Sequence, residues 1–291
     1  MLAADQQEIE NLLSSIDRIS QNTEFGGKRL LDGSMGTNGT AVGESLSFVS
    51  AEATASSSPE QGWEVDIQQI ATRASKKGTA TIEVNNIRNG LQILINEGGR
   101  SVSLNTSEGQ LGRDIEQMLK EVDQFPLRFP AAEMSSQIRG MVVYAINQGI
   151  AENGLKLQVM QAPDNTLLVQ HNNFGDSSTF SVTSSVAGIL SAEANIAQSA
   201  EDGKNIEGTI NNQLGLGEGQ YLTTIQGMEA AGVTVKFDKE LGYHEIPVFD
   251  DAGLKTGTQL IEQKSEDIVG GPNNPKKEGY VHVSQMSKEF Q

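Results

Sequence analysis

Residues 1–33 carry the clearest pattern of apolar and polar positions in the chain. Between residues 6 and 20, apolar side chains recur at steps of three, one, three and three, which places them on one face of a helix. These positions are Ile9, Leu12, Leu13, Ile16 and Ile19. Asp5, followed three residues later by Glu8, is typical of a helix start. We predict an amphipathic helix over residues 6–20, which at this length needs a partner surface.

A glycine-containing segment follows this helix. Gly26 and Gly27 end any helix, and residues 28–31, which precede Asp32-Gly33, suit one arm of a β-hairpin. By pattern alone, residues 6–20 form an ordinary amphipathic helix that packs on a core. The next part of the sequence offers no obvious partner for the apolar face, so we expect it to pack on other helices.

The middle of the chain contains two units of similar plan, each combining strand-like runs with one helical pattern. The strand-like runs are 81–84, 91–95, 100–104, 155–160, 166–171 and 179–183. The helical patterns have apolar faces at Ile115, Met118, Leu119 and Val122, and at Ile138, Met141, Val142, Ala145 and Ile146. Asn153-Gly154 supplies a helix stop and Asp164-Asn165 a turn. We predict antiparallel sheet with helices over one face.

The flanking regions are less regular. Residues 34–60 indicate a linker around one strand at 46–49, and residues 241–279 are polar and irregular. Between them, a strand with Val233, Val235 and Phe237 on one face is predicted, and glycines permit tight turns at Gly215, Gly217 and Gly219. A final strand-like run at 279–284 is expected to return the chain toward the N-terminal domain and to pair with the segment near Leu30.

Several of these segments resemble one protein family. Residues 7–19 and 23–33 resemble bacterial flagellin, as the second helix of its rod-like domain and the extended segment after it; Phe25-Gly26-Gly27 departs from the usual Phe-Asn-Gly. Residues 202–237 are similar to an insert motif shared by flagellins and filament-cap proteins, and residues 138–185 to a module of their variable outer regions. The terminal helices of a complete flagellin are absent, so we expect a trimmed fragment that cannot build a filament alone.

The predicted fold class is α+β: a partial helical rod domain with a β-hairpin arm, and a β-rich outer part of antiparallel sheet with covering helices. We predict a rod-domain segment at 1–45, with a possible return strand at 276–291. A variable α+β outer domain follows at 46–195, and a β-rich insert-motif subdomain at 196–275.

The resemblance implies a structural subunit of the extracellular flagellar filament, active in motility and without enzymatic activity. Its partners would be other flagellin subunits, packed through Ile9, Leu12, Leu13, Ile16 and Ile19, with a flagellar export chaperone and the innate immune receptor for flagellin as further partners. Glu8 aligns with a glutamate that contacts this receptor in some flagellins; the alternative is the helix-start role above. Other readings are a filament-cap or hook-associated protein, and a glycan-binding or enzymatic domain carried on the filament surface.

Composition supports a folded, non-nucleic-acid-binding chain. The 291 residues carry a net charge of −17, with 20% charged and 36% hydrophobic residues. No basic stripe exists to neutralise phosphates, and the same charge disfavours anionic membrane surfaces. Because cysteine is absent, the sequence has neither disulfides nor a thiol nucleophile.

Candidate chemistry is sparse in the sequence. The three histidines, His171, His244 and His282, are far apart, and His244-Glu245 lacks the second histidine of a zinc protease helix. Asp250-Asp251 does not continue into a calcium loop. Trp63 is expected in a core or domain contact. We therefore predict no catalytic residues, no cofactor and no metal ion.

Overall fold

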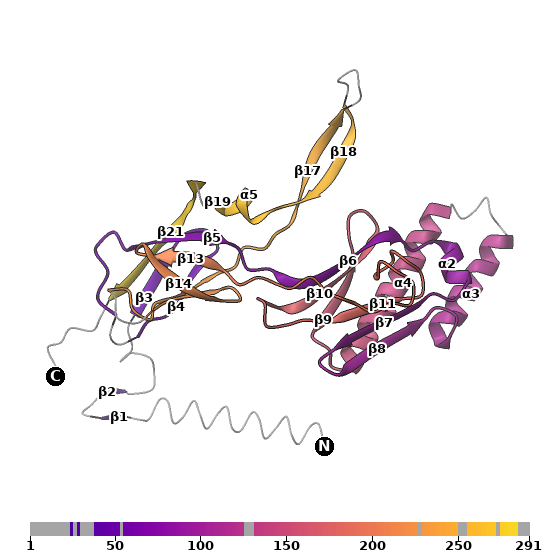
Figure 1. Ribbon diagram of the computed structural model, residues 1–291, viewed down its shortest axis with the longest axis horizontal. Coiled ribbons are helices and arrows are strands. Elements are labelled where there is room, and N and C mark those ends of the chain that lie inside the picture. The colour runs from indigo at the N-terminus through magenta and orange to yellow at the C-terminus, as the bar shows by residue number, and fades with distance from the viewer. Residues whose placement is uncertain are drawn as a thin grey trace.

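The computed structural model describes residues 24–25, 28–29, 38–52, 55–124, 131–225, 229–249, 255–271 and 274–284. Two lobes lie side by side, each with its own hydrophobic core, and a hairpin projects away from both (Figure 1). The predicted helix over 6–20 lies outside the described residues. Within these ranges, no helix combines the length and apolar character that crossing a membrane requires.

One lobe is an eight-stranded antiparallel sheet that nearly closes into a barrel. Its strands are β3 (Asn38–Val42), β4 (Leu46–Ser50), β5 (Trp63–Gln69), β13 (Glu207–Ile210), β14 (Gln213–Glu218), β15 (Tyr221–Thr224), β16 (Thr234–Phe237) and β21 (Lys277–Ser284). They follow the order β3-β21-β5-β13-β14-β15-β16-β4. The end strands approach each other: a Cβ atom on Gly39 would lie 2.5 Å from the Phe48 ring, so glycine permits this proximity.

The barrel core follows from alternation along its strands. Trp63, Val65 and Ile67 of β5 are buried, while the residues between them are only partly buried. The predicted strand at 233–237 is confirmed, with Val235 and Phe237 buried in the same core. Burying each large apolar side chain stabilises the fold by about 1.5–3 kcal/mol. Trp63 is 2% exposed, which confirms its predicted place in a core.

The second lobe packs two sheets with helices. One sheet has the order β6-β10-β9, with β6 (Arg73–Thr81), β10 (Thr166–Phe174) and β9 (Leu157–Gln161). The other has the order β12-β11-β7-β8, with β12 (Gln198–Ser199), β11 (Ser181–Ser184), β7 (Gln92–Glu97) and β8 (Arg100–Asn105). The helices are α2 (Val84–Arg88), α3 (Gly109–Gln124) and α4 (Ala131–Glu152). Helix α4 contacts β8 and β9 and buries Ile138, Val142 and Ile146.

Most predicted elements of this lobe are confirmed. The strands at 91–95, 100–104, 155–160, 166–171 and 179–183 and both helices are present, within a few residues. Asn165 adopts a left-handed turn conformation, with φ of 66°, and Gly154 follows α4 with φ of 65°. The strand predicted at 81–84 is wrong, because Glu83 starts helix α2 instead. There the Asn86 side chain accepts a hydrogen bond from the Glu83 N–H at 2.8 Å.

The region predicted to be irregular contains regular structure. Strands β17 (Tyr243–Phe249) and β18 (Lys255–Glu262) form the projecting hairpin of Figure 1. Helix α5 (Ser265–Val269) and the short pair β19 (Gly270–Gly271) and β20 (Asn274–Pro275) follow. Within the predicted hairpin arm at 28–31, Lys28–Arg29 (β2) forms a short strand, but it pairs with the preceding Glu24–Phe25 (β1). The rest of the arm and the turn expected at Asp32-Gly33 lie outside the described residues.

The predicted fold class is wrong in its architecture. The described chain is rich in β-structure and includes a nearly closed eight-stranded sheet, rather than being organised around a helical rod. The physical reason is long-range pairing: strands from residues 38–50, 63–69, 207–237 and 277–284 join one sheet. Strand β21 lies between β3 and β5, so both of its edges are already paired and none is free for residues near Leu30.

The two cores group the chain by packing. Residues 46–71 and 206–283 supply the barrel core, and residues 74–200 supply the core of the second lobe. The predicted functional divisions at 1–45, 46–195 and 196–275 stay predictions, because packing alone does not define functional units.

Candidate functional site

The junction between the lobes is built from the start of the insert-motif region. Backbone pairing joins the segment at Thr72, between β5 and β6, to Lys204: the Thr72 N–H donates to the Lys204 carbonyl at 2.9 Å, and the Lys204 N–H donates to the Thr72 hydroxyl at 2.9 Å. Gly203 packs directly on the Gly175 and Thr72 carbonyls, where a Cβ atom would collide with backbone. Glycine at 203 therefore permits the close approach of these segments.

Asn205 is the central side chain of this junction. Its Oδ1 accepts a hydrogen bond from the Gly219 N–H at 2.9 Å, and its Nδ2 donates to Asp176 Oδ1 at 2.9 Å. Its backbone carbonyl accepts from Gln69 Nε2 at 3.0 Å. A single residue thus connects the end of β5, the loop after β10 and the turn between β14 and β15. An asparagine suits this place because its amide both donates and accepts.

The glycines downstream have two different roles. Gly219 has φ of 54° in the turn between β14 and β15, which confirms the predicted tight turn there. Gly215 and Gly217 lie within β14 and face inward instead; a Cβ atom on Gly215 would lie 2.5 Å from Leu222, and one on Gly217 would collide with the Ile206 carbonyl. The turns predicted at these two positions are wrong, because the inner wall of the barrel needs their small size.

A polar cleft of about 630 Å³ opens beside the junction. It is lined by residues of β5, β6, the segment 201–207 and the start of α5. Arg73 is one of its lining cations: its guanidinium lies 4.3 Å above the Phe174 ring and its Nη2 lies 2.9 Å from Glu240 Oε1. This geometry holds Arg73 within the protein and links β6 to the segment after β16.

The base of the projecting hairpin contacts the second lobe through charged groups. Lys77 of β6 lies 2.8 Å from Asp164 and 5.8 Å from the centroid of the Tyr243 ring. Burial alone would raise the pKa of Asp164, but hydrogen bonds from Lys77 and Thr166 outweigh it and lower that pKa to about 2. Burial, with the negative charge of Glu262, raises the pKa of Tyr243. Asp164 is therefore ionised, and Tyr243 neutral, at neutral pH.

His171 is the one buried histidine in the described part of the chain. It lies on β10, in agreement with the expected strand position, and its Nε2 lies 2.8 Å from Glu97 Oε1. Its Nδ1 accepts from the Asn173 N–H at 2.9 Å, and Glu97 Oε2 accepts from the Lys156 N–H at 2.7 Å. Because a backbone donor occupies Nδ1, Nε2 carries the proton toward Glu97. Both ring nitrogens are engaged, so this pair bridges the two sheets.

The remaining candidate residues are dispersed. His244 lies on β17 and His282 on β21, in different sheets. The carboxylates and histidines of the described ranges form no group of three that could hold a metal ion. Asp250-Asp251 lies outside these ranges, as do Glu8 and the five predicted packing residues Ile9, Leu12, Leu13, Ile16 and Ile19. The roles predicted for these N-terminal residues therefore stay predictions. The same holds for the prediction that the chain has no catalytic, cofactor-binding or metal site.

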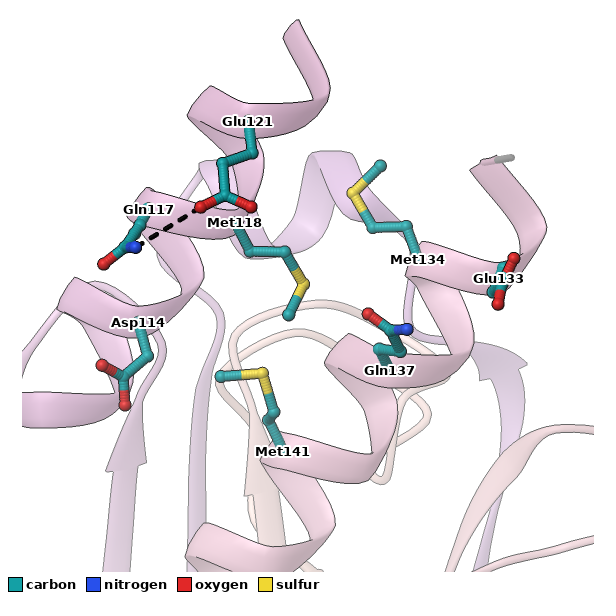
Figure 2. Close-up of a pocket in the computed structure, with 8 residues that line it drawn as sticks. All are labelled: Asp114, Gln117, Met118, Glu121, Glu133, Met134, Gln137 and Met141. Atoms are coloured by element: carbon teal, nitrogen blue, oxygen red, sulfur yellow. Dashed lines mark hydrogen bonds between the residues drawn. The ribbon is translucent and has the colours of Figure 1, made fainter. Parts of the chain in front are cut away.

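A groove of about 300 Å³ separates the facing sides of α3 and α4. Figure 2 shows the methionine side chains extending into it, with polar and acidic groups around them. Its lining residues are Asp114, Gln117, Met118, Glu121, Glu133, Met134, Gln137 and Met141. Met134 is buried, and Met118 and Met141 are partly buried. The methionine side chains of this groove therefore belong largely to the core of the lobe.

Sequence reasoning missed the junction residues. The signal available was the Gly203-Lys204-Asn205 sequence, in which a glycine and an asparagine adjoin β-forming residues. Such a sequence predicts a turn, and its partners Thr72, Gln69 and Gly219 are too distant along the chain to be identified from spacing.

Comparisons with known proteins give similarities to solved structures alone. No family model matches the chain, and no curated protein matches it. The flagellar cap protein FliD D1-D2-D3 domains from Escherichia coli match with a TM-score of 0.37 and 15% identity, over 87% of this chain and 59% of that one. The FliD D2-D3 domains from Serratia marcescens match with a TM-score of 0.36 and 13% identity, over 76% of this chain and 100% of that one. FliD from Bdellovibrio bacteriovorus matches with a TM-score of 0.32 and 14% identity, over 66% and 94%. The chain thus spans about three-fifths of the Escherichia coli structure.

Proposed function

We propose that the chain is a structural component of the bacterial flagellum, carried on the extracellular filament assembly and without catalytic activity of its own. The observation that supports this proposal most is the structural role of residues 203–237. Gly203 and Asn205 join the lobes, and Ile206, Leu222 and Val235 fill the barrel. The segment that resembles a flagellar motif is therefore committed to internal architecture.

Two subunit classes remain candidates for this component. We place a filament-cap protein first, because the segments resembling it, 138–185 and 203–237, supply parts of both cores. A flagellin subunit is the second candidate, supported by the resemblance of residues 7–33. In either class the partners would be other flagellar subunits. An export chaperone, and an immune receptor at Glu8, belong to the same proposal.

Immunogold electron microscopy of the source bacterium tests both levels of the proposal. Antibodies raised against residues 38–284 should label the flagellum, and cells lacking the gene should show no label. Label confined to the distal tip supports the cap class, whereas label along the filament supports flagellin. Flagella that stay unlabelled on cells that produce the protein would contradict the flagellar assignment.

A further inference from the structure

The groove between α3 and α4 has an apolar floor. Met118 and Met141 are only partly buried against the core, and together with the more deeply buried Met134 they extend into the groove (Figure 2). Methionine is flexible and polarizable, so a floor of three methionines can adapt to apolar side chains of different shapes. Methionine is also enriched where proteins bind one another. The floor therefore suits apolar side chains that come from outside the lobe.

The rim of the groove is acidic on both sides. Asp114 and Glu121 lie on the same face of α3, two turns apart, and Glu133 lies on α4 (Figure 2). All three are exposed, and no lysine or arginine of the described ranges lines the groove. The groove therefore combines an apolar floor with three negative charges on its rim.

The cations next to the rim in sequence have other partners. Lys120 Nζ lies 2.6 Å from Glu116 Oε1, and Arg113 Nη2 donates to Gln110 Oε1 at 2.9 Å. None of the three rim carboxylates forms an ion pair with another described residue. Because like charges repel and opposite charges attract, the ligand that this rim favours is cationic.

The shape of the groove fits a helix. It runs between two helices, and the stretch of α3 from Asp114 to Glu121 spans about 10 Å, or two turns. One turn beyond Met141, on the same side of α4, Tyr144 is 65% exposed, and its hydroxyl accepts from Gln148 Nε2 at 2.7 Å. Tyrosine is a common anchor of protein interfaces. An amphipathic helix laid into a groove is a recurrent mode of recognition.

We propose that the groove between α3 and α4 is a docking site for a basic amphipathic helix of a different protein or peptide. The apolar face of that helix rests on the three methionines, and its flanking lysines or arginines face the three rim carboxylates. The rim selects against a second copy of this chain, which carries a net charge of −17. A groove of about 300 Å³ takes up only one side of a short helix, so we expect a Kd of about 10–100 µM.

Methionine methyl NMR of the full chain tests the site directly. The probe is a synthetic peptide of about 14 residues, or about four helical turns, with leucines on one face and lysines on the other. Of the eight methionines, Met118, Met134 and Met141 should change methyl chemical shift and saturate with the expected Kd, whereas Met160 on β9, outside the groove, should not. A peptide of the same composition without an apolar face, and one with glutamate in place of lysine, should bind at least about tenfold more weakly.

Two triple variants separate the rim from the net charge of the chain. Asp114→Asn/Glu121→Gln/Glu133→Gln removes the rim charges and should weaken binding of the basic peptide about tenfold at low salt, a difference that shrinks as salt is added. The matched control removes the same number of charges from exposed glutamates outside the groove and should bind as tightly as the wild type: Glu60→Gln/Glu152→Gln/Glu193→Gln. Circular dichroism and thermal melts verify that each variant is folded.

Three results would overturn the proposal. They are groove methionine signals that stay unchanged up to about 1 mM peptide, equally tight binding of either control peptide, and a rim variant that binds as tightly as its matched control. The first of these is the result expected if the connection between the helices, residues 125–130, which lies outside the described ranges, is itself the occupant of the groove. None of the three affects the flagellar assignment, which the position of the gold label decides.

Discussion

Asn205 offers a direct test of how the two lobes are held together. Replacing it with alanine removes the acceptor of the Gly219 N–H and the donor to Asp176. The first loss leaves a partly buried donor without its partner, which costs about 1–2 kcal/mol, and the second bond is solvent-exposed and adds roughly 0.5 kcal/mol. We therefore expect Asn205→Ala to lower the free energy of unfolding of the barrel lobe by about 2 kcal/mol.

Urea denaturation measures this effect with two probes. Trp63 is the single tryptophan of the chain and is buried in the barrel core, so its fluorescence reports that lobe alone. Far-ultraviolet circular dichroism reports both lobes. With a slope of about 2 kcal/mol per molar urea, the fluorescence midpoint should fall by about 1 M. If the junction couples the lobes, the two transitions coincide in the wild type and separate in the variant.

Two matched variants make the Asn205 prediction refutable. Asn205→Asp keeps an acceptor for Gly219 but places a second carboxylate against Asp176, so its loss of stability should shrink as the pH falls and the carboxylates are protonated. Asn172→Ala changes an exposed asparagine on β10 and should have little effect. A midpoint for Asn205→Ala within error of the wild type, or equal to that of Asn172→Ala, would refute the reasoning.

Three further predictions rest on other parts of the fold. Gly217→Ala should destabilise the barrel by at least about 2 kcal/mol in the same urea assay, whereas Gly140→Ala, with open space around it in α4, should stabilise by up to about 1 kcal/mol. His171→Ala should cost about 2–4 kcal/mol, because it leaves a cavity and removes the partner of Glu97 Oε1; a loss below about 0.5 kcal/mol would contradict the bridging role. The pKa of Asp164 is depressed from 3.8 to about 2 on folding, so its contribution is present above pH 4 and is lost as the pH falls toward 2. Since half of that side chain is exposed, the contribution is below about 1 kcal/mol, and pH-dependent melts of Asp164→Asn should lack it.

Local structure in the second lobe was predictable from the sequence. Helices α3 and α4 show a 3.6-residue period of apolar residues, and their sides carrying Ile115 and Ile138 are buried as that period predicts. The turn at Asn165 and the helix stop at Gly154 were also recoverable, because left-handed backbone favours these two residue types. These signals are local, and each needs only residues that are close along the chain.

The barrel was not predictable, since its formation depends on partners far apart in sequence. β3 pairs with β21, which lies more than two hundred residues away, and its own sequence, Asn38–Val42, has little β-forming character. The hairpin strands β17 and β18 were missed for a related reason. Pro247 interrupts the apolar pattern of β17, β18 is mostly polar and contains Gly257, and the pairing of the two strands with each other defines them.

Strand β14 shows a limit of pattern analysis. In Gln213–Glu218, leucine and glycine alternate, so a period of two identifies two faces without revealing which is inside. The default, leucine inward, fails because Leu222 and Ile206, from β15 and the segment before β13, already fill the interior. The face of a strand is thus decided by the volume its neighbours leave. Where that volume forces glycine inward, the leucines of the same strand face outward.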